Sequence, residues 1–261
     1  MKRTALITGA TGGLGKAFAG VFANNGFDLV LSGRNMEELE KTAKELTEKH
    51  GTKVLTVASD LAEDGGADRL FGKTVEKGIA VDVLVNNAGF ADFGLFAGCD
   101  PKKQQEMIEV NVAALVRLTR LFLPGMLERG EGRILNVASL AAFQPGPLMA
   151  CYYASKAFVL SFSVALSAET EGTGVTVTAL CPGTMKTGFE KHASMAGKSM
   201  LFSSMKPIEA RSVAEYGYRS LMRGKTIAVH GRKNRLLVFL TGIAPKRMSA
   251  KAVMRYQRPV A

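Results

Sequence analysis

The sequence predicts an α/β protein built on a doubly wound, seven-stranded parallel sheet. Short apolar runs alternate with segments of helical spacing along most of the 261 residues, and polar or glycine-rich clusters follow the first six of these runs. Strands that alternate with helices imply right-handed crossovers and a sheet covered on both faces. With 47% hydrophobic and 22% charged residues, the chain has the length of one large domain over residues 1–261 and is short for two.

The N-terminal half supplies four of the expected strands, each followed by a helix. The strands are expected at residues 5–7, 27–31, 53–57 and 81–85, and the helices at 16–23, at 36–50, in a stretch ending near 77, and at 101–127. Glu and Lys at helical spacing predict the second helix, which Gly51 ends. Pro101 suits the first turn of the fourth helix, because its missing N–H is not needed there.

The C-terminal half supplies the other three strands and two more helices. Strands are expected at residues 132–137, 175–180 and 226–229, and helices at 151–170 and 207–223. In such sheets, ligands bind outside the carboxyl ends of the strands, at the point where the strand order reverses. The polar clusters that follow the first six strands are therefore expected to meet at one edge of the sheet.

The turn after the first strand, residues 8–15, indicates an anion-binding loop. Its sequence is Thr-Gly-Ala-Thr-Gly-Gly-Leu-Gly, and it leads from a short strand into a helix. Glycine lets the backbone bend and approach a ligand, and the start of a helix presents unpaired N–H groups at the positive end of its dipole. The spacing of Gly9, Gly13 and Gly15 differs from the common dinucleotide fingerprint and from a P-loop. Purely steric use of glycine at a strand-to-helix corner is the alternative.

The strongest chemical signal is Tyr152-Tyr153-Ala154-Ser155-Lys156, which opens the helix after the fifth strand. Tyr152 and Lys156 are four residues apart, so their side chains lie on one helix face. A tyrosine has an unperturbed pKa of about 10, and a neighbouring ammonium lowers it toward the range in which the phenol exchanges protons at neutral pH. Tyr153 is three residues from Lys156 and can also touch it, so spacing leaves both tyrosines as candidates. A packing tyrosine beside a solvated lysine is the alternative.

Cysteine usage and the N-terminus predict a cytoplasmic protein with neither disulfides nor a metal site. Cys99, Cys151 and Cys181 are odd in number, scattered and in no metal-ligand spacing. Thr8 and Gly9 cut short the first apolar run, which is too brief for a signal peptide. No later segment is expected to have the ~20 apolar residues of a membrane span.

Together, these residues resemble the short-chain dehydrogenase/reductase family over residues 1 to about 230. The shared set, in the family's order and separations, is Thr8, Gly9, Gly13, Gly15, Asp60, Asn86, Asn87, Ala88, Gly89, Asn111, Ser139, Tyr152, Lys156, Pro182 and Gly183. The resemblance implies a Rossmann-type fold, hydride transfer between a nicotinamide and a carbonyl or secondary alcohol, and a homodimer or homotetramer.

The resemblance also implies the roles of four side chains. Tyr152 would protonate the developing alkoxide, and Lys156 would lower the pKa of Tyr152 and hold the nicotinamide ribose. Ser139 would hydrogen-bond the substrate oxygen, as an oxyanion hole does. Asn111 would hold a water that links Lys156 to solvent. An amide on the helix surface and a turn serine at a strand end are the alternatives for Asn111 and Ser139.

The cofactor that the resemblance implies is NADP. Its contacts are expected from Gly9, Thr11, Gly13, Leu14, Gly15, Arg34, Asp60, Leu61, Asn87, Ala88, Gly89, Tyr152, Lys156, Pro182, Gly183 and Thr184. Gly33 stands where family members that use NAD usually carry Asp, and Arg34 can pair with a 2′-phosphate through two parallel hydrogen bonds. Many NADP-using relatives carry a basic residue at the position of Gly12, whereas the nearest cation here is Lys16. A solvated Arg34 is the alternative.

Residues 185–206 correspond to the family's mobile lid over the substrate. The segment contains Met185, Met195, Met200, Met205, Phe189, Leu201 and Phe202. Methionine-rich surfaces adapt to varied apolar shapes, which favours an apolar ketone, aldehyde, acyl or steroid-like substrate. Neighbouring loops carry Phe90, Phe93, Phe96, Phe143 and Met149, which either line the same cavity or belong to the core. The alternative function is that of a non-catalytic NADP-binding regulatory or scaffold protein. The presence of the complete set Asn111, Ser139, Tyr152 and Lys156 argues against this alternative.

Positive charge concentrates in an extension over residues 230–261. The chain has a net charge of +11, and the extension holds Arg232, Lys233, Arg235, Lys246, Arg247, Lys251, Arg255 and Arg258 with no Asp or Glu. Its apolar run at residues 236–240 suits a helix packed on the domain or on a dimer partner, which is the preferred interpretation. Peripheral contact with anionic lipid is the second. Nucleic acid is not expected, because no recognition motif or aromatic stacking platform accompanies the charge.

Overall fold

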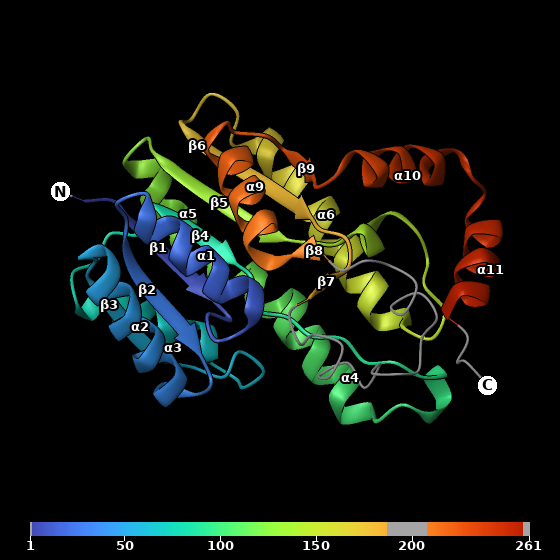
Figure 1. Cartoon of the computed structure of the whole chain (residues 1–261), viewed down its shortest axis with the longest axis horizontal. Coiled ribbons are helices and arrows are strands. Elements are labelled where there is room, and N and C mark those ends of the chain that lie inside the picture. The colour runs from blue at the N-terminus through green and yellow to red at the C-terminus, as the bar shows by residue number, and fades with distance from the viewer. Residues whose placement is uncertain (1, 187–207, 258–261) are drawn as a thin grey trace.

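Seven parallel strands form one sheet in the order β3-β2-β1-β4-β5-β6-β9 (Figure 1). The computed structural model describes residues 2–186 and 208–257. The strands are β1 Thr4–Thr8, β2 Asp28–Gly33, β3 Val54–Ala58, β4 Val83–Asn86, β5 Gly132–Val137, β6 Val175–Cys181 and β9 Ile227–Val229. The prediction of a doubly wound, Rossmann-type sheet of seven parallel strands is confirmed. The chain order reverses between β1 and β4, so the ligand-binding crevice is expected at their carboxyl ends.

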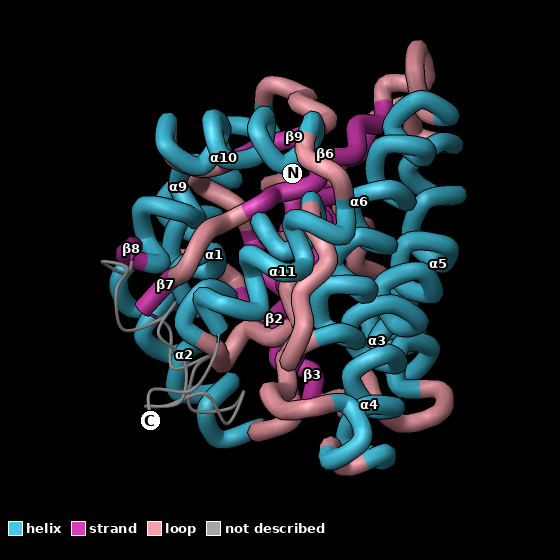
Figure 2. The backbone as a smooth tube through the Cα atoms, turned by 90° about the vertical axis from the view of Figure 1, so that its right-hand side faces the viewer, coloured by secondary structure: helices cyan, strands magenta, loops and turns pink. Residues whose placement is uncertain are grey.

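Helices cover both faces of the sheet, as Figure 2 shows from the side. One face carries α1 Gly13–Asn24, α2 Met36–His50 and α9 Ala210–Met222, and the other carries α3 Gly66–Glu76, α5 Ala114–Glu128 and α6 Ala150–Glu169. Alternate strand residues feed the two cores, because successive side chains on a strand point to opposite faces. Ile7 and Leu31 belong to the first core, and Leu6 and Val30 to the second.

Helix α2 shows how local sequence sets the boundaries of an element. The Asn35 side chain caps its first turn by accepting a hydrogen bond from the N–H of Glu38 at 3.1 Å. Glu37 and Glu38 complement the positive end of the helix dipole, and Lys49 complements the negative end. Gly51 ends the helix at a φ of 61°, a left-handed conformation that glycine adopts without strain. The predicted bounds 36–50 are therefore confirmed.

The long helix predicted at 101–127 is interrupted. It begins as α4 Pro101–Ile108, passes through a π-helical segment Glu109–Ala113, and continues as α5 to Glu128. Hydrophobic spacing gave no sign of the extra residue that such a segment inserts. Two short strands, β7 Met185–Lys186 and β8 Ile208–Glu209, also pair in a separate small sheet that the sequence did not predict.

Two helical stretches, Pro101–Glu128 and Ala150–Glu169, are long and apolar enough to cross a membrane by length and composition alone. The expectation that no segment reaches this limit was therefore wrong. Each stretch nevertheless lies against the sheet, where Phe122, Met126 and Leu166 are buried in the second core. Long apolar helices of this kind are expected where helices cover the face of a parallel sheet.

The extension after β9 forms two helices, α10 Arg232–Ile243 and α11 Lys246–Gln257, at the right of Figure 1. They lie beyond the layers of the sheet and its covering helices (Figure 1). Helix α11 returns to the body of the protein through Val253, which packs beside Met149 and Tyr153. Helix α10 contacts the short 3₁₀ helix Leu140–Phe143 that follows β5.

Candidate active site

The turn between β1 and α1 has the geometry of a phosphate-binding loop. Gly9 has a φ of 63°, and a Cβ on Gly15 would lie 2.1 Å from the carbonyl oxygen of Gly9. Only glycine therefore allows this close approach of strand end and helix start. Helix α1 begins after Gly12 with no side-chain cap and no acidic residue in its first turn. Its N–H groups are left for an external anion, and they fit the pyrophosphate of a dinucleotide.

The loops that follow β1 and β4 are tied together at the reversal of strand order. Thr8 Oγ1 accepts hydrogen bonds from the backbone N–H groups of Asn87 and Ala88, each at 3.0 Å. The Asn87 amide donates in return to the carbonyl oxygens of Thr8 at 2.8 Å and Gly9 at 3.2 Å. Asn87 was predicted only as a cofactor contact, and here it also braces the turn. Thr8 was noted as part of the motif, but its bracing role was missed.

The end of β2 fits a 2′-phosphate. Arg34 is exposed and makes no hydrogen bond or ion pair with the residues that the structure describes. A Cβ on Gly33 would lie 3.3 Å from Thr11, which leaves little room for an aspartate side chain. Lys16 pairs with Glu38 at 2.8 Å and thereby holds the pKa of Glu38 below its ordinary value. Arg34, rather than Lys16, is thus the cation left for a phosphate.

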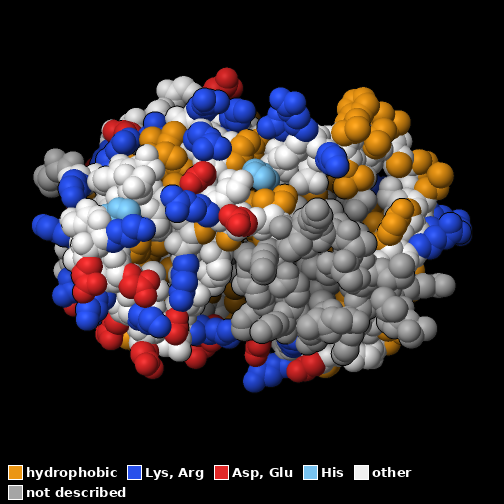
Figure 3. All heavy atoms as spheres, in the orientation of Figure 1, with side chains coloured by type: hydrophobic (Ala, Val, Ile, Leu, Met, Phe, Trp, Pro, Cys, Tyr) orange, Lys and Arg blue, Asp and Glu red, His pale blue; other side chains and the backbone are white. Residues whose placement is uncertain are grey.

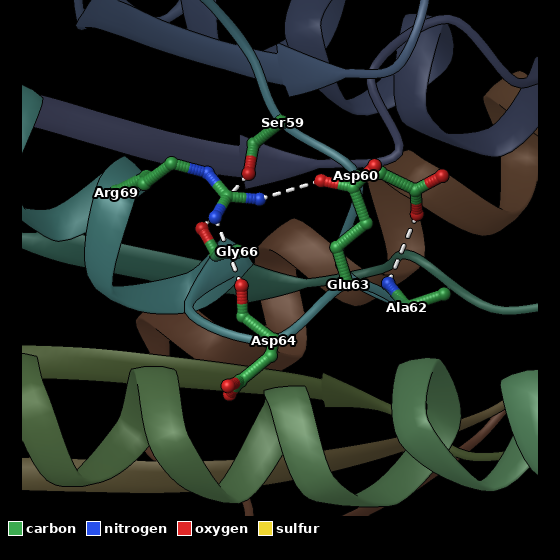
Figure 4. Close-up of polar contacts among 7 residues, drawn as sticks. All are labelled: Ser59, Asp60, Ala62, Glu63, Asp64, Gly66 and Arg69. Carbon is green, nitrogen blue, oxygen red and sulfur yellow. Dashed lines mark hydrogen bonds and ion pairs between the residues drawn. The ribbon is translucent and has the colours of Figure 1, made fainter.

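The loop after β3 is held by its own contacts (Figure 4). Asp60 Oδ1 accepts a hydrogen bond from the N–H of Ala62 at 2.9 Å. Across the same loop, Arg69 donates to the carbonyl oxygen of Asp64 and to Glu63 Oε2, both at 2.8 Å. These contacts fix the Asp60 carboxylate at the rim of the sheet, two strands from the glycine turn.

The predicted cofactor residues come together at one edge. Tyr152 and Lys156 lie on α6. Most of the others occupy loops at the carboxyl ends of strands, namely Gly9, Thr11, Arg34, Asp60, Leu61, Asn87, Ala88, Gly89, Pro182, Gly183 and Thr184. Gly13, Leu14 and Gly15 form the first turn of α1. Pro182 is also engaged in the fold, because its carbonyl oxygen accepts from the N–H of Leu140 at 3.0 Å.

Tyr152 lies beside Ser139. Burial of the Tyr152 phenol raises its pKa, and the nearby Ser139 hydroxyl lowers it by less, so the net shift is upward. Ser139 is itself held at the start of the short 3₁₀ helix, where its Oγ accepts from the N–H of Ala141 at 3.1 Å. The serine hydroxyl therefore lies beside the phenol, between the end of β5 and the first turn of α6.

Tyr153 occupies a packing position instead. Its phenol oxygen accepts a hydrogen bond from Gln257 Nε2 at 2.7 Å, on the far end of α11. A Cβ on Gly146 would lie 2.3 Å from the Tyr153 ring, so that glycine is required for the ring to fit. Burial raises the pKa of Tyr153 well above its ordinary value. Of the two tyrosines, Tyr152 is the one whose phenol lies beside Ser139.

Lys156 lies inside the protein beside this pair. Only 6% of it is exposed, its Nζ donates to the carbonyl oxygen of Val137 at 2.8 Å, and Nζ lies 5.9 Å from the centre of the Tyr152 ring. Burial lowers the pKa of Lys156 to about 8. The expected lowering of the Tyr152 pKa by Lys156 is not seen, because the phenol is desolvated and the ammonium is directed at the Val137 carbonyl.

Asn111 is buried in the π-helical segment, so the alternative of a surface amide was wrong. Its amide donates to the carbonyl oxygen of Phe90 at 3.0 Å and to Ser155 Oγ at 3.1 Å, and its Oδ1 accepts from the N–H of Phe90 at 3.0 Å. A Cβ on Gly89 would lie 2.8 Å from Asn111 Oδ1 and 3.3 Å from Lys156 Nζ. Asn111 thus ties the loop after β4 to α6 beside Lys156. The water that it would hold stays a prediction.

Comparison with known proteins agrees with this geometry. The family model described as short chain dehydrogenase matches residues 3–196. The chain belongs to the short-chain dehydrogenase family. Membership of this family supports an oxidoreductase that acts on CH–OH groups, and the roles of the individual side chains stay predictions.

Individual short-chain dehydrogenases similar to this one differ in what they act on. The chain is 38% identical over 192 residues to a very-long-chain 3-oxoacyl-CoA reductase of Anas platyrhynchos, covering 72% of this chain and 61% of that relative. It is 35% identical to sulfoacetaldehyde reductase 2 of Chromohalobacter salexigens, covering 92% of this chain and 95% of the relative. A short-chain dehydrogenase from Sphingobium yanoikuyae in complex with NADPH superimposes with a TM-score of 0.81 at 28% identity, covering 92% and 94% of the two chains.

The surroundings of Tyr152 in this short-chain dehydrogenase are apolar. Met149 and Phe93 pack in the same cluster as Tyr152, whereas Phe143 belongs to a neighbouring cluster. Phe96 is largely exposed, and it borders a small hollow together with Met149. A hollow of 330 Å³ borders Phe93 on the loop between β4 and α4, away from Ser139 and Lys156. Most of the predicted lid at 185–206 lies outside the described residues, which end at 186 and resume at 208.

Proposed function

We propose that the chain is an NADP-dependent oxidoreductase that reduces the carbonyl group of an apolar substrate, or oxidises the matching secondary alcohol. The observation that carries the proposal is the placement of Ser139 and Tyr152 side by side, next to the buried Lys156, at the sheet edge where α1 begins. The uncapped start of α1 and the unpaired Arg34 support NADP, as does the NADPH in the similar Sphingobium yanoikuyae protein. A scaffold without turnover is not favoured, because the four side chains are present together.

The side chains divide the chemistry of reduction between them. NADPH, when bound, would supply the hydride that the carbonyl carbon accepts. The Ser139 hydroxyl donates a hydrogen bond to the carbonyl oxygen, and the Tyr152 phenol gives that oxygen its proton as negative charge develops. Lys156 holds the nicotinamide ribose, and Asn111 keeps the adjoining loop in place through Phe90. Ser139 Oγ and Lys156 Nζ are each already held by a backbone hydrogen bond, so little reorganisation of these two groups is required.

Protonation favours the reductive direction at neutral pH. Burial raises the pKa of Tyr152, which keeps the phenol in its acid form. Lys156 has a pKa of about 8, so it is cationic below that pH and becomes neutral above it. We therefore expect reductive kcat/KM to fall as pH rises through about 8, in profiles measured between about pH 6 and pH 10.

The variant Lys156→Arg provides the control for this pH profile. Arginine stays charged throughout that range, so any residual reductive activity is expected to lose the fall near pH 8. A native profile that remains flat to about pH 10 would contradict the assignment to Lys156.

Substrate class is tested by a panel of carbonyl compounds. Met149 and Phe93 beside Tyr152 favour apolar groups, as does the similarity to a reductase of very-long-chain 3-oxoacyl-CoA. We expect kcat/KM for NADPH-dependent reduction to rise at least about tenfold along a series of ketones of growing chain length, since each buried methylene adds about 0.8 kcal/mol. Preference for sulfoacetaldehyde, a small anion, would contradict an apolar pocket. Absence of NADPH oxidation with every carbonyl would favour the scaffold alternative.

Three further expectations stay predictions. They are one domain over residues 1–261, a lid formed by residues 185–206, and assembly as a homodimer or homotetramer. The first two concern segments that include undescribed residues, and the third requires a measurement of mass in solution.

A further inference from the structure

Helix α10 packs against the body through its less apolar face. Asn234, Val238 and Thr241 are partly buried, and they recur at the spacing of one helix face. Asn234 Nδ2 donates to the carbonyl oxygen of His230 at 2.7 Å, and Val238 packs beside the cluster of Val159 and Val229. This inner face is narrow and contains two polar residues. The attachment of α10 therefore uses little of its apolar surface.

The large apolar residues of α10 face outward. Leu236 is 60% exposed, Phe239 65%, Leu240 54% and Ile243 70%, and none of the helix is fully buried. Their spacing places them on one face, opposite Asn234 and Val238. Met248 at the start of α11 continues the exposed apolar surface. Figure 3 shows this gathering of orange side chains at the upper right. A surface helix normally has the reverse arrangement, so the outward face is suited to a partner.

Cations flank this apolar face, and the C-terminal extension that carries it contains no acidic residue. Arg232 and Lys233 begin α10, Lys246 and Arg247 begin α11, and all four are exposed. Residues 230–261 contain no Asp or Glu. A second copy of the chain, docked face to face, would bring two such cationic extensions together without a compensating carboxylate. A partner that combines an apolar interior with an anionic surface satisfies both features.

We propose that α10 docks in the plane of an anionic lipid bilayer, with Leu236, Phe239 and Ile243 in the acyl region and the flanking cations at the headgroups. A helix of 12 residues is about 18 Å long, too short to cross a hydrocarbon core of about 30 Å, so it lies along the surface. Electrostatic attraction to anionic headgroups adds to the burial of apolar side chains.

The docked helix would lie beside the candidate active site. Helix α10 contacts the 3₁₀ helix that begins after Ser139, and a Cβ on Gly183 would lie 2.9 Å from Asn234 Nδ2. Resting on the proposed function, this placement brings the rim of the site close to the bilayer, where apolar carbonyl substrates concentrate. The docking surface itself depends on neither cofactor nor turnover.

Vesicle binding by the full chain tests the inference. The purified protein is sedimented with vesicles of phosphatidylglycerol and phosphatidylcholine, or of phosphatidylcholine alone, without cofactor or substrate. We expect binding to the anionic vesicles that weakens with added salt, and at least about tenfold weaker binding by the triple variant L236S/F239S/I243S. The double variant K233Q/R247Q is expected to lose the preference for anionic lipid.

Matched controls separate docking from general hydrophobicity. Val75 on α3 and Leu95 before α4 are also exposed, at 58% and 70%, so V75S and L95S are expected to bind vesicles like the native chain. Circular dichroism confirms that each variant is folded. No native binding to either vesicle, or equal binding by the triple variant, would overturn the inference. So would a native oligomer that the triple variant converts to monomers without any vesicle binding, which would assign the face to a second copy.

Because these measurements omit the reaction, a lack of turnover would leave their result intact. Likewise, an active enzyme that ignores vesicles would overturn the docking inference and leave the proposed function standing.

Discussion

Replacement of Tyr152 by phenylalanine is expected to lower kcat by about 10²–10⁴-fold, with NADPH affinity nearly unchanged. The variant keeps the ring that packs beside Phe93 and Met149, but it loses the hydroxyl that lies beside Ser139 and would supply the proton. Steady-state rates with the best ketone of the panel and NADPH titration by fluorescence measure the two quantities separately.

Tyr153→Phe is the matched control, because it removes the same atom from the next residue. That change breaks the 2.7 Å hydrogen bond with Gln257 and is expected to lower the free energy of unfolding by about 1 kcal/mol. Its kcat should stay within about threefold of the native value. If Tyr153→Phe abolished turnover and Tyr152→Phe did not, the roles of the two tyrosines would be reversed.

The choice between these tyrosines lay beyond the sequence. Both can reach Lys156 by helical spacing, and the difference comes from Gln257, which lies 104 residues further along the chain. The extension that brings Gln257 back was predicted only as a packed or interfacial segment. Long-range contacts of this kind leave no periodic signal.

Local patterns, by contrast, predicted most of the sheet and the edge at which the site forms. Apolar runs gave all seven strands, and the cap Asn35 with Gly51 accounts for the observed ends of α2. Asn111 shows the limit of such patterns. Its burial follows from a π-helical segment whose inserted residue does not alter the hydrophobic spacing enough to be recognised.

The electrostatics of the site were the least predictable feature. The i, i+4 spacing of Tyr152 and Lys156 suggested that the ammonium lowers the pKa of the phenol. Burial of both groups has the larger effect, raising the pKa of Tyr152 and lowering that of Lys156. Desolvation depends on every element packed around a group, and spacing along one helix does not contain that information.

Replacement of Arg34 by alanine is expected to weaken NADPH binding by about 10–100-fold and to leave NADH binding unchanged. A charge-assisted hydrogen bond contributes about 1.5–3 kcal/mol, which corresponds to that range of affinity. NADH lacks the 2′-phosphate, so it gains nothing from the guanidinium. Arg34 is suited to this role because it has no other partner among the described residues. Titration of both cofactors gives the affinity ratio directly.

Two lysines provide controls for this change. Lys44 on α2 has a side chain 78% exposed, so Lys44→Ala removes a cation from the same helix region with no expected change in the ratio. Lys16→Ala removes a cation that is already paired with Glu38, and its effect on the ratio is expected to be smaller than that of Arg34→Ala. A larger effect of Lys16→Ala would mean that Lys16 leaves Glu38 for the phosphate. An unchanged ratio in Arg34→Ala would instead remove the structural basis for preferring NADPH, because Gly33 has no side chain with which to discriminate between the two cofactors.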